Sequence, residues 1–141
     1  MAGYFDKLDG RVYDGGHKAG EELANGVFAS ITANGVKKLT AAGNAKFRVE
    51  EKTSLWGLPA VRLVCIDAGT AEIYFVENEW EIYGDKDYDE SEYTIPADHF
   101  VRMRRPVLND EVIMSIDATL FASLNVGDEV KPAAGGTIVA A

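Results

Sequence analysis

Cysteine and histidine are scarce in this chain of 141 residues, and their scarcity limits its chemistry. The single cysteine, Cys65, can form no disulfide within the chain, and its place in an apolar run predicts a reduced thiol in the core. The two histidines, His17 and His99, give neither a zinc-ligand spacing nor a base beside a serine in a nucleophile motif. We therefore expect a protein that is not an enzyme and has no cofactor and no metal site.

Long hydrophobic runs and an excess of basic charge are also lacking. No apolar run approaches the ~20 residues that span a bilayer. Residues 1–20 lack the basic start and apolar centre of a signal peptide. The formal net charge of -9 argues against binding to nucleic acid, which depends on lysine and arginine. We expect a protein made and used in solution, with neither a membrane nor a nucleic acid as partner.

Acidic residues are concentrated in residues 67–92, which we call the acid-rich stretch. It contains ten of the 23 acidic residues and one base, Lys86, whereas the rest of the chain has 13 residues of each sign. Clustered like charge builds a potential that scattered charge does not, so the stretch can steer a basic surface towards the protein. The nearby arginines at positions 102, 104 and 105 are an alternative partner for it within the chain.

Acidic and apolar residues alternate near the middle of this stretch. Glu77, Glu79 and Glu81 would lie on one side of a strand, with Trp80 on the other. The loop that follows begins with the spacing of an EF-hand but lacks that loop's glycine and its final glutamate. A looser divalent site there stays open, with four candidate ligands: Asp85, Asp87, Asp89 and Glu92.

Short runs of apolar and β-branched residues, separated by turn residues, predict strands. The expected strands are residues 27–32, 36–39, 46–51, 61–66, 72–76 and 111–116. Asn34-Gly35 is the strongest hairpin signal among them, and the run 61–66 predicts a strand buried on both faces. Residues 94–110 contain two prolines and are expected to be irregular. Asp117 is expected to cap a short helix, and a last hairpin flanks Gly135-Gly136.

The first part of the chain is expected to differ from the rest. Residues 1–26 contain six glycines, and glycine raises the entropy lost when a segment becomes ordered. We therefore expect a flexible N-terminal arm at residues 1–25 and a single β-rich domain at residues 26–141. The aromatic residues of the arm, Tyr4, Phe5 and Tyr13, are candidate anchors for a partner surface.

The expected elements give one fold class. Short strands with few helices favour a mainly β fold, a small antiparallel barrel or sandwich, because alternating strands bury one face against a second sheet. One or two short helices and the extended N-terminal arm complete the prediction.

The C-terminal third resembles small head proteins of tailed bacteriophages. The likeness lies in three motifs: Asp-Glu-Val-Ile-Met-Ser-Ile at 110–116, Leu-Phe-Ala-Ser-Leu-Asn-Val-Gly-Asp-Glu-Val at 120–130 and Gly-Gly-Thr-Ile at 135–138. In that group a strand is followed by a short apolar helix, a Val-Gly-Asp turn and a final hairpin. The glycine-rich start is similar to the arms of capsid decoration proteins, also called cement or head-stabilising proteins.

The resemblance implies a structural protein of the virion. Such a protein is made in the host cytoplasm, binds the major capsid protein on the outer surface of a phage shell, stabilises the shell and can self-associate there. The expected contact residues are Tyr4, Phe5, Tyr13, Glu77, Glu79, Trp80 and Glu81. Two alternatives stay open: another virion component, such as a head fibre base or a tail protein, and a small carbohydrate-binding or hydrolase barrel that uses Trp80 and Tyr83.

Overall fold

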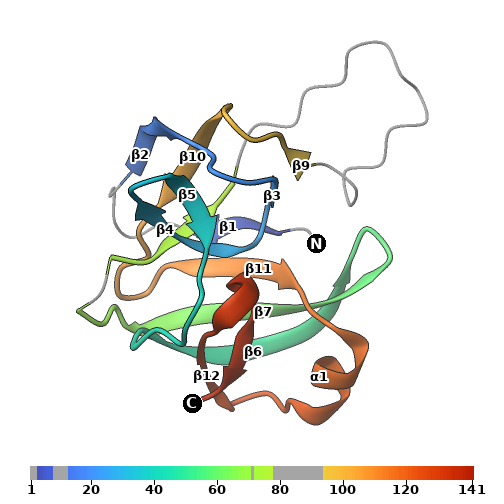
Figure 1. The fold of residues 1–141 in the computed structure, drawn as a ribbon. Helices are drawn as coiled ribbons and strands as arrows, with labels where there is room; N and C mark the ends of the chain where they lie inside the picture. Colours follow the sequence, from blue (N-terminus) through green and yellow to red (C-terminus); the bar gives the residue numbers. More distant parts are fainter. Residues whose placement is uncertain (1–2, 8–12, 71, 78–93) are drawn as a thin grey trace.

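The fold is a mainly β sandwich of two antiparallel sheets with a third, two-stranded sheet against one of them (Figure 1). A computed structural model describes residues 3–7, 13–70, 72–77 and 94–141. The predicted mainly β class with short helices is confirmed, and the sandwich alternative fits better than a closed barrel.

The first sheet has six strands in the order β1-β11-β7-β6-β12-β13. Its centre is the long hairpin of β6 and β7, and the two ends of the chain supply its edges. The bounds are β1 Gly3–Lys7, β6 Lys46–Leu55, β7 Leu58–Asp67, β11 Glu111–Ser115, β12 Glu129–Pro132 and β13 Ile138–Ala140. Helix α1 (Ala118–Ser123) and the 3-10 turn η2 (Ala134–Gly136) lie between its last strands.

The second sheet has five strands in the order β2-β10-β8-β4-β5, and the third pairs β3 with β9. The bounds are β2 Tyr13–Lys18, β3 Leu23–Ala24, β4 Phe28–Thr32, β5 Gly35–Lys38, β8 Tyr74–Val76, β9 Thr94–Ile95 and β10 Phe100–Arg104. The predicted hairpin at Asn34-Gly35 joins β4 to β5, with Gly35 at a φ of 100°. Thr32 holds this turn, because its Oγ1 donates to the Gly35 carbonyl.

Aromatic contacts join the two large sheets in the core. The ring of Phe28 in β4 lies 5.4 Å from that of Phe47 in β6 and 5.3 Å from that of Phe75 in β8. Alternation along β6 turns Phe47 and Val49 inward and leaves the charged residues on either side of each exposed. The main core therefore consists of inward residues from both sheets.

β8 is buried on both faces of the second sheet, which explains its apolar run. Phe75 points into the main core, while Tyr74 and Val76 point to a second cluster on the opposite face. That cluster is covered in part by Leu23 of β3 and Ile95 of β9. The prediction of burial on both faces for residues 61–66 was only half right, because alternate residues of β7 are half-buried.

The segment predicted as a free arm contributes three strands to the domain. β1 pairs with β11, in the register Gly3↔Met114, and β2 pairs with β10. The glycines that suggested weak packing allow a close approach: a Cβ on Gly3 would lie 2.5 Å from Gly26 Cα and 2.6 Å from the Ile113 carbonyl oxygen. The described parts of residues 1–25 therefore belong to the sandwich, which corrects the predicted boundary.

The segment predicted to be irregular, residues 94–110, contains a central strand. β10 pairs with β2 on one side and β8 on the other. Its buried residues, Val101 and Met103, alternate with half-buried arginines. The two prolines exclude a helix, but they flank this strand and leave it intact. The predicted helix is present as α1, although the Asp117 side chain makes no capping hydrogen bond.

Two turns with one pattern fix β11 and β12 to the central hairpin. In the first, the Asp110 carboxylate accepts from the Val107 N–H at 2.9 Å, and in the second the Asp128 carboxylate accepts from the Asn125 N–H at 2.8 Å. The first turn exchanges two backbone bonds with Cys65 of β7. The second exchanges the matching two with Val49 of β6. Residues 107–112 and 125–130 thus form a local repeat that the sequence analysis missed.

Cys65 lies in the core, as predicted. Burial, together with the charges of Asp110 and Asp67, raises the pKa of its thiol from 9.0 to about 11, against an opposing backbone hydrogen bond at Asp67. The unfolded thiol therefore ionises first as the pH rises.

We expect the free energy of unfolding to fall between about pH 9 and 11, by up to about 2 to 3 kcal/mol, because only the unfolded state loses this proton there. Urea unfolding of the natural chain and of Cys65→Ala at several pH values measures how much the Cys65 thiol contributes to this loss of stability. An equal pH slope in the two proteins would contradict it.

The two aspartate turns provide a matched test of burial. Asp110 is 1% exposed, whereas Asp128 is partly exposed. We expect Asp110→Ala to lower the free energy of unfolding by about 1 to 3 kcal/mol, because it leaves a part-buried N–H without its acceptor. Asp128→Ala should cost about 1 kcal/mol or less, since water can replace the carboxylate. Equal losses in urea unfolding would show that burial does not decide the difference.

Candidate interaction surfaces

The predicted arm residues lie in two different sheets. Tyr4 and Phe5 are on β1, paired with Ile113 and Val112, and Tyr13 is on β2, paired with Arg104. The structure describes the side chain of Tyr4 but only the backbone of Phe5 and Tyr13. These residues therefore do not form one arm-borne site, and the Tyr4 ring packs within its own domain.

Glu77 is the one member of the predicted acidic face that the structure describes. It is half-buried, and its N–H donates to the carbonyl oxygen of Arg102 at 3.0 Å. Glu77, within the acid-rich stretch, thus lies beside the arginine-bearing strand β10. Glu79, Trp80 and Glu81 lie outside the described residues, as do Tyr83 and the acidic residues of the candidate divalent site.

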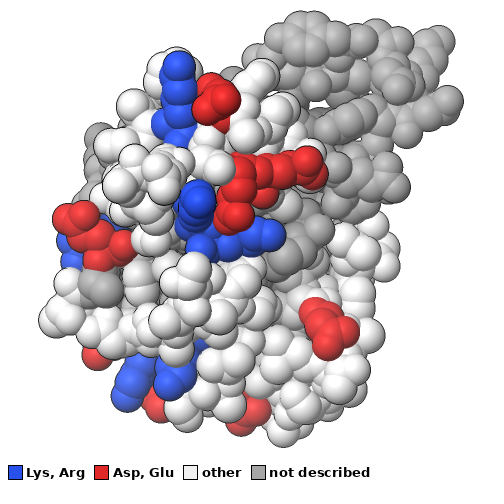
Figure 2. All heavy atoms as spheres, in the orientation of Figure 1, with Lys and Arg blue, Asp and Glu red and all other residues white. Residues whose placement is uncertain are grey.

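Away from the acid-rich stretch, charge is mixed. On the face drawn in Figure 2, lysine and arginine side chains are interspersed with aspartate and glutamate. Two pairs on the six-stranded sheet are close, Arg48 with Glu50 at 2.8 Å and Arg62 with Glu51 at 3.3 Å. Exposed pairs of this kind contribute little to stability. The described part of the face in Figure 2 therefore shows both signs of charge intermixed.

An apolar cluster lies on the six-stranded sheet near the tip of the β6–β7 hairpin. We call it the tip cluster: Tyr4, Leu55, Leu58, Ala60 and Ile113. These residues come from β1, β6, β7 and β11. The sheet thus carries a small core of its own, separate from the one between the sheets.

Trp56 stands at the tip of this hairpin in a strained conformation. Its φ is 48° and that of Gly57 is 80°, the combination of a two-residue hairpin turn that favours asparagine followed by glycine. A bulky side chain in the left-handed region costs roughly 1 to 2 kcal/mol. Trp56 is nevertheless 42% exposed, with the Tyr4 ring 6.2 Å away. Packing among the described residues does not explain why a tryptophan occupies the turn.

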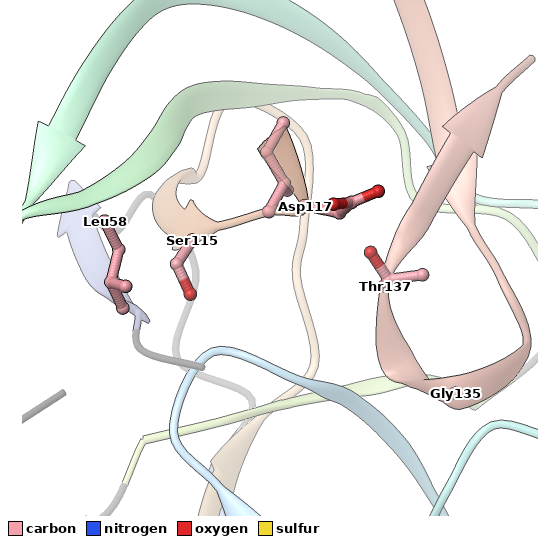
Figure 3. Close-up of a pocket in the computed structure, with 6 residues that line it drawn as sticks. Leu58, Ser115, Asp117, Gly135 and Thr137 are labelled. Carbon is pink, nitrogen blue, oxygen red and sulfur yellow. The ribbon is translucent and has the colours of Figure 1, made fainter. Parts of the chain in front are cut away.

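A cavity of about 460 Å³ opens beside the tip cluster. Its described lining is mostly apolar and comes from the start of β7, the end of β11 and the loop before β13 (Figure 3). The lining residues are Leu58, Ser115, Ile116, Asp117, Gly135 and Thr137. Figure 3 shows the Asp117 carboxylate and the Thr137 hydroxyl directed towards the same side of this space. Its volume is within the range of ligand pockets.

Sequence patterns alone did not identify Trp56 or the cavity as candidate parts of an interaction surface. Leu55-Trp56-Gly57-Leu58 follows an alternating strand, so Gly57 was a usable turn signal. The cavity is formed by three segments far apart in the chain, and no spacing predicts their meeting. Other large apolar side chains are exposed singly, among them Phe100 at 58% and Val126 at 63%. Scattered exposure of this kind is usual on soluble proteins.

The described residues include neither a metal-ligand cluster nor a membrane-spanning helix. Over the described ranges, no group of three or more potential ligand side chains is placed to hold a metal ion. No helix within the part of the chain that the structure describes is both long and apolar enough to cross a membrane. His17 and His99 are both exposed.

No family model, curated protein or solved structure matches this chain. The resemblance of residues 108–141 to phage head proteins therefore stays a prediction, and so does the function that it implies.

Proposed function

We propose that this protein is a structural component of a phage virion that binds the outer surface of the assembled capsid and stabilises it. The observation that carries the proposal is the order of elements in the C-terminal third. The resemblance implied a strand, a short helix, a Val-Gly-Asp turn and a final hairpin. The chain has β11, α1, a turn at 125–128 and the β12–β13 hairpin in that order.

The same elements form an outer part of the six-stranded sheet. β12 and β13 continue the sheet beyond β6, and β11 lies on the far side of β7. The turn at Gly127 is fixed by its two bonds with Val49. The C-terminal third is thus built rigidly onto the central hairpin, as a protein that reinforces a larger shell requires.

The acid-rich stretch is the surface proposed to meet the coat protein. The stretch begins at the end of β7, includes β8 and ends before β9, and all three strands pair within the fold. Its charge would attract a basic coat surface, with the major capsid protein as the partner. The arginines of β10 lie near Glu77 and are the alternative partner within the chain.

Stabilisation of a shell follows from binding alone and involves no reaction. A ligand that binds the assembled state in preference to the free subunits shifts the equilibrium towards assembly. Many copies on one lattice add their contributions. The competing roles, as a fibre base, a tail protein or a carbohydrate-binding barrel, differ in the partner that they require.

Charge reversal tests the proposed contact. We expect the variant Glu77→Lys, Glu79→Lys, Glu81→Lys to bind emptied phage shells at least about tenfold more weakly than the natural chain in co-sedimentation. The remaining binding should depend less on salt, because salt screens attraction between exposed charges. Deleting residues 1–25 is unsuitable, since it removes β1, β2 and β3.

The matched control changes the same kind of charge elsewhere. Glu50→Lys, Glu111→Lys, Glu129→Lys alters the net charge equally but lies on the six-stranded sheet. It should retain binding. Equal weakening in both variants would mean that only net charge matters, and no binding of the natural chain to any shell would refute the proposed function. Quenching of tryptophan fluorescence by sugars would instead favour the carbohydrate-binding alternative.

A further inference from the structure

The side chain at the tip of the β6–β7 hairpin and the adjacent cavity are complementary in size and polarity. The tip presents an exposed indole in a turn that favours a small residue. The cavity presents an unfilled apolar surface of a size that accepts an aromatic ring. Leu58 belongs to both, since it follows the turn by one residue and lines the cavity. The projecting group and the recess are therefore neighbours that are joined through Leu58.

Trp56 does not fill this cavity in its own chain. Its ring is in contact with Tyr4, and it is not among the residues that line the space. The hairpin turn between Leu55 and Leu58 has only two residues, which fixes the backbone position from which the indole projects. The cavity is therefore open to an indole from another molecule.

The polar groups at the cavity also suit an indole. A buried tryptophan usually donates its N–H to an acceptor. The Asp117 carboxylate is at the cavity, makes no capping bond to α1, and is directed to the same side as the Thr137 hydroxyl (Figure 3). Either oxygen can accept from an indole N–H. An apolar lining with such acceptors matches the apolar ring and the single N–H donor of a tryptophan side chain.

We propose that Trp56 of one copy enters this cavity on a second copy, and that the second copy returns the same contact. A two-fold dimer needs each surface to contain both halves of the contact, so that residue i meets residue j and j meets i. This chain contains both, joined through Leu58. Tryptophan is also the residue type most often found to dominate such contacts. This inference does not rest on capsid binding, since it concerns the free chain in solution.

Sedimentation equilibrium of the full chain over a range of concentrations tests the proposal. The natural chain should shift from monomer to dimer as its concentration rises. Trp56→Asn should weaken the dimer at least about tenfold. Asparagine suits a positive φ, so this variant removes the indole without adding backbone strain. Phe100→Ala removes an exposed ring far from the tip cluster in the chain and should leave the dimer unchanged.

A second variant acts from the opposite side of the contact. Thr137→Phe places a ring in the cavity and should also abolish the dimer, although Trp56 is intact. A mixture of Trp56→Asn with Thr137→Phe should form a hybrid, because one chain retains the cavity and the other retains the indole. The hybrid has one of the two contacts and should be weaker than the natural dimer.

Tryptophan emission gives an independent readout. In a Trp80→Phe background Trp56 is the remaining tryptophan, and its emission should shift to shorter wavelength as the dimer forms. A chain that stays monomeric up to millimolar concentration would overturn the proposal. So would a dimer that Trp56→Asn leaves intact while circular dichroism shows both proteins folded. Failure of capsid binding alone would leave the dimer unaffected, so the two proposals can fail separately.

Discussion

The contact of Phe28 with Phe47 and Phe75 is the interaction on which the sandwich depends. Phe28 and Phe75 are neighbours within one sheet, and Phe47 reaches them from the other. Each large sheet has an apolar inner face that it must bury. These three rings meet at centroid distances of 5.3 to 5.4 Å, a separation at which aromatic pairs attract beyond simple burial. The third sheet, the helix and the loops are arranged around the two large sheets that this aromatic contact joins.

Much of this arrangement follows from local sequence. The alternation of charged and apolar residues around Phe47 and Val49 predicted a strand with one solvent-exposed face. Asn34-Gly35 predicted the hairpin that the chain forms. The short helix and the closing hairpin were also placed correctly. In these segments the residues that decide the structure are neighbours in the chain, so patterns of two to four residues carry the information.

The segments that escaped prediction depend on distant partners. β1 looked like a loose arm because its glycines were assessed alone, whereas Gly3 is close to Gly26 and Ile113 in the fold. β10 was hidden by prolines that limit it at both ends. The candidate surfaces were equally hidden, because the cavity collects β7, β11 and the loop before β13. Tyr4 was chosen for its ring, but its neighbour Trp56 is the residue whose backbone signals a special role.

The edges of the six-stranded sheet have a consequence for how the chain is made. Residues 3–7 leave the ribosome well before residues 111–115, with which they pair. The β4–β5 and β6–β7 hairpins can form during synthesis, whereas the pairing of β1 must await the synthesis of β11. Such high contact order slows folding and leaves strand edges open in the nascent chain. The nascent chain is therefore most exposed to aggregation during this interval.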